Sequence, residues 1–163
     1  MKDSIDHLPQ NKQDELAQVV EVICSVIDDL EMIILFGSYA RGDYKEKADL
    51  KQDRWSGHAS DYDILVVTGT RETAEDVTLA NQITEQCDAR KLTTVRMIMH
   101  DLEYLNIQLA EGQYFFSDIK KEGCQLFSSD GAELADKLTL TPAEQQRSTQ
   151  RTLRKYANKS SAW

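Results

Sequence analysis

Residues 33–42 read Ile-Ile-Leu-Phe-Gly-Ser-Tyr-Ala-Arg-Gly and decide the fold. The apolar run Ile33–Phe36 stops at a Gly-Ser pair, and a short apolar run bounded by glycine is typical of a buried strand that enters a tight turn. Gly37 allows the backbone to come close to a ligand. Ser38 adds a hydroxyl and backbone N–H groups where a short helix is expected to begin, an arrangement that suits a phosphate.

A second stretch, residues 60–67, reads Ser-Asp-Tyr-Asp-Ile-Leu-Val-Val and predicts another strand. On that strand Asp61 and Asp63 point to the same face, because side chains alternate with a period of two. Two adjacent carboxylates repel one another unless a cation lies between them, and their oxygen atoms favour Mg²⁺. The alternative, two solvated acids at a strand end, fits less well beside an apolar run. A phosphate-binding turn and a dicarboxylate on neighbouring strands together predict a metal–nucleotide site.

The two motifs also resemble a known signature. The Gly-Ser pair at 37–38, followed after a spacer by Asp-x-Asp at 61–63, resembles the signature of the DNA polymerase beta-like nucleotidyltransferase superfamily. The fuller forms, GSYARG at 37–42 and SDYD at 60–63, are similar to the minimal nucleotidyltransferases, the MNT type. Those proteins are often fused to or paired with an all-helical HEPN domain.

The resemblance implies a reaction and a set of roles. The reaction is transfer of a nucleoside monophosphate from an NTP, with ATP as the first choice, to a hydroxyl acceptor. Asp61 and Asp63 would be catalytic residues that bind Mg²⁺, with Mn²⁺ as a second option, and Gly37, Ser38 and Arg41 would bind the nucleotide. The acceptors that the resemblance implies are protein side chains, small hydroxyl compounds such as aminoglycosides, and nucleic-acid ends. The MNT type favours a protein such as a HEPN-type partner, which would make this chain antitoxin-like.

One part of the superfamily pattern is missing. A third acid is usual on a later strand, but the strand expected here reads Thr-Val-Arg-Met-Ile-Met at 94–99 and has no carboxylate. Asp101 and Glu103 stand where the next helix begins, and an acid there is expected to cap the helix. Turnover is expected to be slow unless one of these acids or one from the 43–53 segment, such as Asp49 or Asp53, moves into the site, or the acceptor protein supplies its own group. Two interpretations follow: a slow or partner-dependent nucleotidyltransferase, and a nucleotide-binding or partner-binding module of the same fold without turnover.

Composition limits the classes of partner and the cell compartment that are expected for this protein. The net charge of −9 and a pI near 4.8 disfavour a nucleic-acid partner that is held through its phosphates. No apolar run reaches the length of a membrane span, and the first residues carry acids instead of an apolar segment. Three widely spaced cysteines are expected to be buried free thiols, so a cytoplasmic protein is predicted. The sequence leaves both a homo-oligomer and a hetero-oligomer open.

Apolar strands alternate with amphipathic helices, which predicts an α/β (α+β) nucleotidyltransferase-like domain at 1–130, with a mixed sheet and helices packed mainly on one face. Residues 43–59 are expected to form a polar inserted loop. Residues 131–163 are expected to be a linker and a polar C-terminal helix at 141–157, leading to a helical domain beyond this sequence or to a partner chain. The expected strands are 32–36, 61–67, 95–99 and 124–127, and the other helices are 12–28, 73–88, 101–111 and 117–122.

Three aromatic or titratable features stay outside this scheme. Trp55 in the inserted loop could stack on a base or anchor the loop, and anchoring is favoured. His58 is expected to be exposed, since a lone histidine in a loop rarely acts on its neighbours. The aromatic run 114–116 is expected to belong to the core and not to a stacking platform, because few basic residues flank it.

Overall fold

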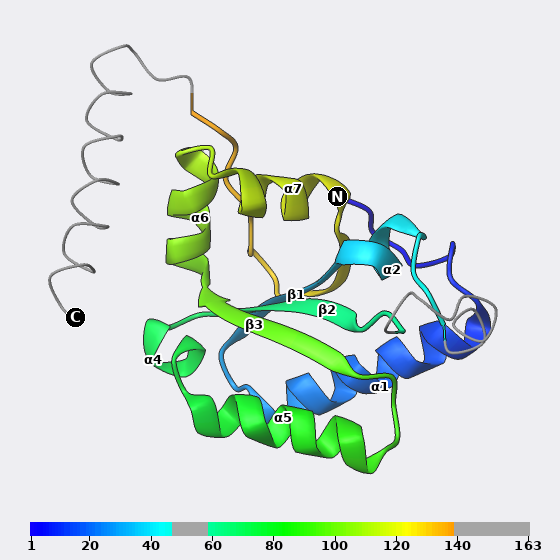
Figure 1. Ribbon diagram of the computed structural model, residues 1–163. Helices are drawn as coiled ribbons and strands as arrows, with labels where there is room; N and C mark the ends of the chain where they lie inside the picture. The colour runs from blue at the N-terminus through cyan, green and yellow to red at the C-terminus, as the bar shows by residue number, and fades with distance from the viewer. Residues whose placement is uncertain (47–58, 139–163) are drawn as a thin grey trace, which may run out of the picture.

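The computed structural model describes residues 1–46 and 59–138 (Figure 1). A four-stranded sheet with the order β3-β2-β1-β4 lies at its centre. The central strands β1 (Leu30–Phe36) and β2 (Tyr62–Thr68) pair antiparallel, so the two motif-bearing strands are neighbours, as predicted. β3 (Val95–Asp101) pairs parallel with β2, and β4 (Cys124–Ser128) pairs antiparallel with β1. The predicted mixed sheet and α+β class are confirmed.

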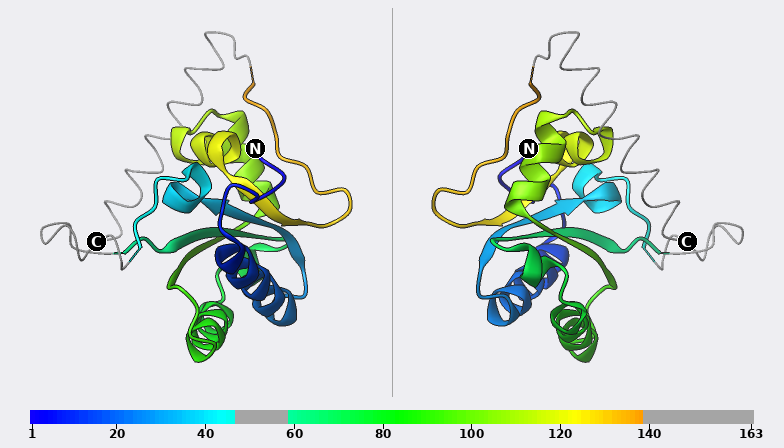
Figure 2. Two further views of the ribbon diagram at one scale, coloured as in Figure 1. Left: turned by 90° about the vertical axis from the view of Figure 1, so that its right-hand side faces the viewer. Right: turned by 90° about the vertical axis from the view of Figure 1, so that its left-hand side faces the viewer.

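Helices cover both faces of this sheet, so the prediction that they pack mainly on one face is wrong. Figures 1 and 2 show α1 and α5 side by side on one face and α6 and α7 on the other. The larger hydrophobic cluster lies under α1 and α5, the two longest of the described helices, and a smaller cluster lies under α6 and α7. The helix bounds are α1 (Gln10–Val26), α2 (Gly37–Arg41), α4 (Arg71–Ala74), α5 (Val77–Ala89), α6 (Leu102–Ala110) and α7 (Tyr114–Glu122).

The alternation along β2 decides which face receives the predicted site. Tyr62, Ile64 and Val66 belong to the cluster under α1 and α5. Leu65 and Val67 belong to the cluster under α6 and α7. Asp63 has the parity of this second set, so its carboxylate is directed to the face that α7 covers.

Two of the described helices start more than two residues away from the predicted position. The expected helix 73–88 is two helices, because the Asp76 side chain accepts from the backbone N–H groups of Thr78 and Leu79 and so starts α5 itself. An aspartate satisfies such orphan donors better as a cap than inside a helix. The expected helix 117–122 begins three residues earlier, with the side chain of Gln113 as its cap.

The chain after β4 returns along α6. The Leu138 N–H donates to the Ala110 carbonyl, and Asn106 on α6 bonds the backbone of both Glu133 and Ala135. The first residues of the predicted linker therefore lie against the domain. The predicted helix 141–157, Trp55 and His58 lie outside the described residues.

The cysteines correct one expectation. Cys87 and Cys124 are buried, but Cys24 is exposed on α1, and all three are free thiols. Over residues 1–46 and 59–138, no helix combines the length and apolar character needed to cross a bilayer.

Candidate active site

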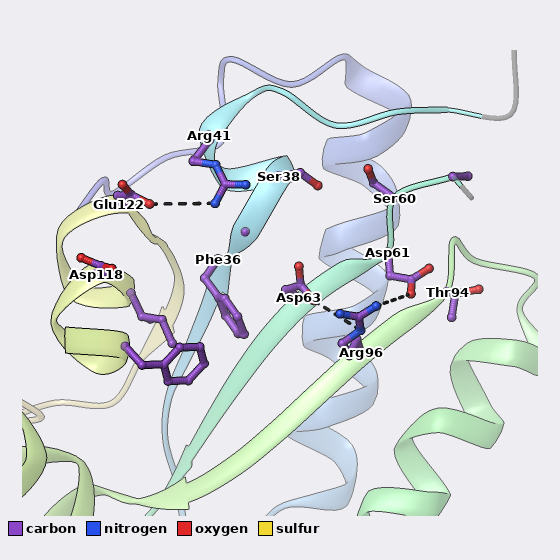
Figure 3. A pocket seen from close by; sticks show the side chains of 14 residues that line it. Phe36, Ser38, Arg41, Ser60, Asp61, Asp63, Thr94, Arg96, Asp118 and Glu122 are labelled. Atoms are coloured by element: carbon purple, nitrogen blue, oxygen red, sulfur yellow. Dashed lines mark ion pairs between the residues drawn. The ribbon is translucent and has the colours of Figure 1, made fainter. Parts of the chain in front are cut away.

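The residues predicted to form the site line one pocket at the start of β2. Its volume is about 900 Å³, and it is bounded by the turn after β1, by the first residues of β2 and β3, and by α7 (Figure 3). Gly37, Ser38, Arg41, Asp61 and Asp63 all line it. The structure therefore brings the two motifs together, and the roles given to these side chains remain predictions.

Gly37 lies at the point where the turn touches the dicarboxylate. Its φ of +74° is in the left-handed region, which costs little only for glycine. A Cβ at this position would collide with the Asp63 carboxylate oxygen Oδ2. The two residues meet because Phe36 pairs with Asp63 in the β1–β2 ladder. Glycine is thus required by backbone conformation and by close approach at once.

The short helix α2 is held from its far end. The Lys2 ammonium donates to the Ala40 carbonyl at 3.0 Å, and His7 Nε2 lies 2.8 Å from the Tyr39 carbonyl oxygen. These contacts occupy carbonyl groups that a helix terminus leaves without partners. At the other end Phe36 is the cap residue and makes no side-chain hydrogen bond to the helix. Gly37 and Ser38 line the pocket, and the cap residue provides no side-chain hydrogen bond to the first N–H groups of α2.

Asp61 and Asp63 share a cation from the third strand. Arg96 pairs with Asp63 in the parallel β2–β3 register, and its Nη2 lies 3.6 Å from Asp61 Oδ2 while its Nε lies 3.8 Å from Asp63 Oδ1. Figure 3 shows the guanidinium between the two carboxylates. Burial raises the pKa of Asp63; Arg96 opposes the shift, Asp61 adds to it, and the net pKa is above the ordinary value.

The acids considered for the third position lie elsewhere. Asp101 accepts from the Tyr104 N–H and caps α6, as predicted. It pairs with Thr68 at the opposite end of β3 from Arg96, roughly 16 Å along the strand. Glu103 lines a different pocket together with Asp101. The suggestion that either acid swings into the site is therefore wrong. Asp49 and Asp53 of the inserted loop lie outside the described residues.

α7 forms the opposite wall, and sequence reasoning missed it. Phe115, Asp118 and Glu122 line the pocket from this helix. The expectation that 114–116 is core is correct for Phe116, which is buried, and wrong for Tyr114 and Phe115, which are 76% and 41% exposed. The spacing of 118 and 122, i and i+4 on a helix, was the available signal for two acids on one face.

Arg41 is placed between this wall and the turn. Its Nη1 lies 3.9 Å from Glu122 Oε2, and its Nε lies 3.4 Å from Asp43 Oδ2. About half of its side chain is exposed, so these pairs are weak and the guanidinium is available to an anion in the pocket.

A hydrogen-bond network lies behind Asp61, on the other face of β2. Glu15 on α1 accepts from the Tyr62 hydroxyl at 2.7 Å and from both the N–H and the hydroxyl of Thr93. Lys12 donates to the Thr93 hydroxyl and lies 3.5 Å from Glu15. This network fixes the first residue of β2 against α1 and the chain that leads into β3.

The ends of the inserted loop are held together beside the site. The Ser60 N–H donates to the Lys45 carbonyl at 2.7 Å, and the Lys45 N–H donates to the Ser60 hydroxyl at 2.8 Å. These two bonds hold Ser60, the residue that precedes Asp61, against Lys45.

The donor set fits one Mg²⁺ that arrives with a nucleotide. Mg²⁺ is typically bound by one or two carboxylates together with substrate phosphates and water, and Asp61 and Asp63 supply two carboxylates on one face. Among the described residues no group of three His, Cys, Asp or Glu side chains is close enough to hold a metal by itself. The set therefore does not supply the three-acid cage that the superfamily pattern implies.

The sequence matches no protein-family model and no curated protein. Among solved structures, it is similar to a toxin-antitoxin with AMP-PNP, at 18% identity and a TM-score of 0.44 over 90% of each chain. It is also similar to a tri-AMPylated Shewanella oneidensis HEPN toxin in complex with MNT antitoxin, at 12% identity and a TM-score of 0.45 over 93% of this chain and 94% of that one. A third is a Sulfolobus solfataricus protein provisionally assigned as a nucleotidyltransferase, with 20% identity, a TM-score of 0.40, and 78% and 86% coverage.

These structures are similar to this chain, but the resemblance to MNT-type nucleotidyltransferases rests on the two motifs of its own sequence. With identities of 20% or less and TM-scores below 0.5, they carry no conclusion about activity, nucleotide or partner. Those conclusions rest on the pocket and its residues.

Proposed function

We propose that this chain is a metal-dependent nucleotidyltransferase that moves a nucleoside monophosphate from an NTP to a hydroxyl group. The observation that carries the proposal is the contact between Gly37 of the turn and the Asp63 carboxylate, both of which line the pocket. A triphosphate bound at the turn would therefore lie beside a metal bound by the dicarboxylate. The pocket of about 900 Å³ is large enough for a nucleoside triphosphate.

Each residue would have one task. The N–H groups of the Gly37–Ser38 turn and the guanidinium of Arg41 would bind phosphate oxygens. Asp61 and Asp63 would hold Mg²⁺, or Mn²⁺, which when bound neutralises charge on the triphosphate. In the reaction the acceptor oxygen forms a bond to the α-phosphorus, the bond from that phosphorus to the β-phosphate bridging oxygen breaks, pyrophosphate leaves, and the hydroxyl proton passes to water.

The nucleoside end of the pocket would lie along α7. Phe36 and Phe115 form an edge-to-face pair with ring centroids 6.0 Å apart, and both line the pocket. Such a wall supplies apolar surface to a nucleobase, which stacks on or against aromatic rings. ATP remains the first choice of nucleotide on the resemblance alone.

The acceptor would be a protein in the cytoplasm, of the HEPN type by the motif resemblance, and this chain would then be antitoxin-like. The charge of −9 supports a protein acceptor over a nucleic acid. The polar residues 131–163 would join the domain to such a partner, whether on another chain or beyond this sequence.

A second function has support from one observation. Arg96, and not a carboxylate, stands across from Asp63 on β3. This favours a module that binds a nucleotide without turnover, or turnover that requires a group from the partner.

Radiolabel transfer separates the two functions. The chain is incubated with Mg²⁺ and ATP labelled on the α-phosphate, with and without the protein encoded beside it, and protein-bound label and released pyrophosphate are measured. We expect label on the partner with wild type and none with the double variant Asp61→Asn/Asp63→Asn. Nucleotide binding with no label and no pyrophosphate in any arm would select the module. Label that persists in the double variant would overturn the proposed site.

A further inference from the structure

Arg96 lies on the strand on which a third acid is expected. It is the second residue of β3, and the parallel register places its Cα opposite that of Asp63. The remaining residues of β3 up to His100 carry no acid, and Asp101 is used as a helix cap at the far end. The place next to the dicarboxylate is thus filled by a positive charge.

A single guanidinium reaches both carboxylates. Its Nη2 faces Asp61 at 3.6 Å, its Nε faces Asp63 at 3.8 Å, and the dashed lines of Figure 3 show both pairs. The other arginine of the pocket, Arg41, pairs with Asp43 and Glu122. Arg96 therefore offsets one of the two negative charges of the dicarboxylate in the absence of metal.

The Arg96 side chain can leave without disturbing the core. It is 72% exposed, whereas Asp61 and Asp63 are 31% and 19% exposed, so the arginine covers the acids from the solvent side. Both contacts are longer than a good charge-assisted hydrogen bond, and pairs of this kind are weak. A divalent cation that uses the same oxygens has to displace it, because two cations cannot occupy one gap between carboxylates.

We infer that Arg96 is an exchangeable counter-cation of the dicarboxylate, which keeps Asp61 and Asp63 paired before substrate arrives and makes a divalent cation enter with its nucleotide instead of alone. This inference rests on the proposed function, because it takes Asp61 and Asp63 as the metal ligands. It deepens that function by stating the order of binding and by giving Arg96 a positioning role.

The test measures Mn²⁺ binding without nucleotide, by titration with detection of free Mn²⁺ in electron paramagnetic resonance. Wild type is compared with Arg96→Gln and Arg96→Lys. We expect Arg96→Gln to bind Mn²⁺ about tenfold tighter, as removal of two weak ion pairs allows, and Arg96→Lys to stay near wild type. Equal Mn²⁺ affinity in wild type and Arg96→Gln would overturn the inference.

Two controls test whether a gain in Mn²⁺ affinity comes from the loss of Arg96 at the site, from the change in net charge or from a change of fold. Arg71→Gln removes an exposed arginine that pairs with Glu75 on α4, away from the pocket, and is expected to leave Mn²⁺ affinity unchanged. An equal gain in this variant would show an effect of net charge and overturn the inference. Thermal unfolding of Arg96→Gln checks that the fold is kept, and Arg96→Thr, which also removes the charge and suits a strand, replaces it in the same titration if it is not.

The remaining arms distinguish failure of the inference from failure of the proposed function. In Arg96→Gln/Asp61→Asn/Asp63→Asn the gain in Mn²⁺ affinity should disappear, and a gain that survives would overturn the inference. If Arg96 instead holds phosphate, Arg96→Gln weakens binding of metal-free ATP and leaves Mn²⁺ affinity unchanged, which also overturns it. The proposed function fails separately, if Asp61→Asn/Asp63→Asn leaves Mn²⁺–ATP binding unchanged in the wild-type background.

Discussion

Tyr62 and Asp63 are neighbours on β2, but their side chains enter two different environments. On the face of α1, the Tyr62 hydroxyl bonds Glu15, whose carboxylate also accepts two bonds from Thr93. On the face of α7, Asp63 has beside it Asp61, of the same charge, and the largely exposed Arg96 at 3.8 Å. Glu15 accepts three hydrogen bonds from its own protein. The charge of Asp63 is offset by one weak ion pair with Arg96.

The pKa values of Glu15 and Asp63 are shifted in opposite directions in these two environments. Burial raises the pKa of Glu15, but the hydrogen bonds from Tyr62 and Thr93 outweigh burial, and the net pKa is lowered. At Asp63 burial is again the largest cause, Arg96 only partly offsets it, and the net pKa is raised. Glu15 is thus held as a structural anion. Asp63 keeps an attraction for a further cation, as expected of a site that binds one.

The largest stability effect should come from Glu15. Glu15→Gln removes a charged acceptor of three hydrogen bonds and should lower the free energy of unfolding by about 2 kcal/mol in urea denaturation. Glu21→Gln on the same helix is the matched control, since Glu21 is 69% exposed and faces Arg90 at 3.4 Å. The control should change by less than about 0.5 kcal/mol. An equal loss of unfolding free energy in the two variants would contradict the proposed difference between the two faces of β2.

Gly37 tests the other face. Gly37→Ala and Gly131→Ala both place a side chain at positive φ, +74° and +80°, so both incur the same backbone strain. Only the first also meets the Asp63 carboxylate, because a Cβ on Gly131 has nothing within 4 Å. We expect Gly37→Ala to cost about 1 kcal/mol more than Gly131→Ala in urea denaturation. The same cost for both would mean that the turn and Asp63 are not in contact.

Asp63→Asn should have a smaller effect of opposite sign to that of Glu15→Gln. The change removes the burial cost and the repulsion from Asp61, and it loses one weak pair with Arg96. The free energy of unfolding should rise by about 0.5 kcal/mol at pH 7 in the absence of metal. A fall of 1 kcal/mol or more would identify Asp63 as a structural acid like Glu15.

The smallest expected effect is the pH dependence of the changes in the free energy of unfolding caused by Glu15→Gln and Asp63→Asn. A raised folded pKa means that Asp63 lowers stability at neutral pH, and the advantage of Asp63→Asn should fade as the pH falls through that pKa. A lowered folded pKa means that Glu15 contributes stability above its unfolded pKa of about 4.3, which is lost as the pH falls toward the folded value. Both variants should therefore approach wild type on acidification, from opposite sides, Asp63→Asn first. Parallel pH profiles would contradict this.

Local patterns were sufficient for the part of the site that lies on β1 and β2. The period of two joins Asp61 to Asp63, and two apolar runs that each end in a polar motif place Gly37 near them. Asp101 could also be read as a cap from its position alone.

The rest depends on contacts between elements distant in sequence. The partnership of Arg96 with the dicarboxylate needs the parallel register of β2 and β3, which no short pattern specifies. The sequence places Phe115 in the core because few basic residues flank it, but its place at the pocket depends on how α7 packs across the sheet. The division of helix 73–88 was missed because Thr73 and Asp76 both fit a capping pattern, and Asp76 is the residue that caps α5.

Calorimetric titration with a non-hydrolysable ATP analogue tests the central claim most directly, because it measures the metal–nucleotide site without requiring an acceptor. Wild type and Asp61→Asn/Asp63→Asn are each titrated with Mg²⁺ present and with Mg²⁺ chelated. We predict that wild type binds the analogue at least about tenfold tighter with Mg²⁺, and that the double variant loses this dependence while keeping its fold. Binding of equal affinity in both proteins with Mg²⁺ present would contradict the assignment of Asp61 and Asp63 and the function built on it.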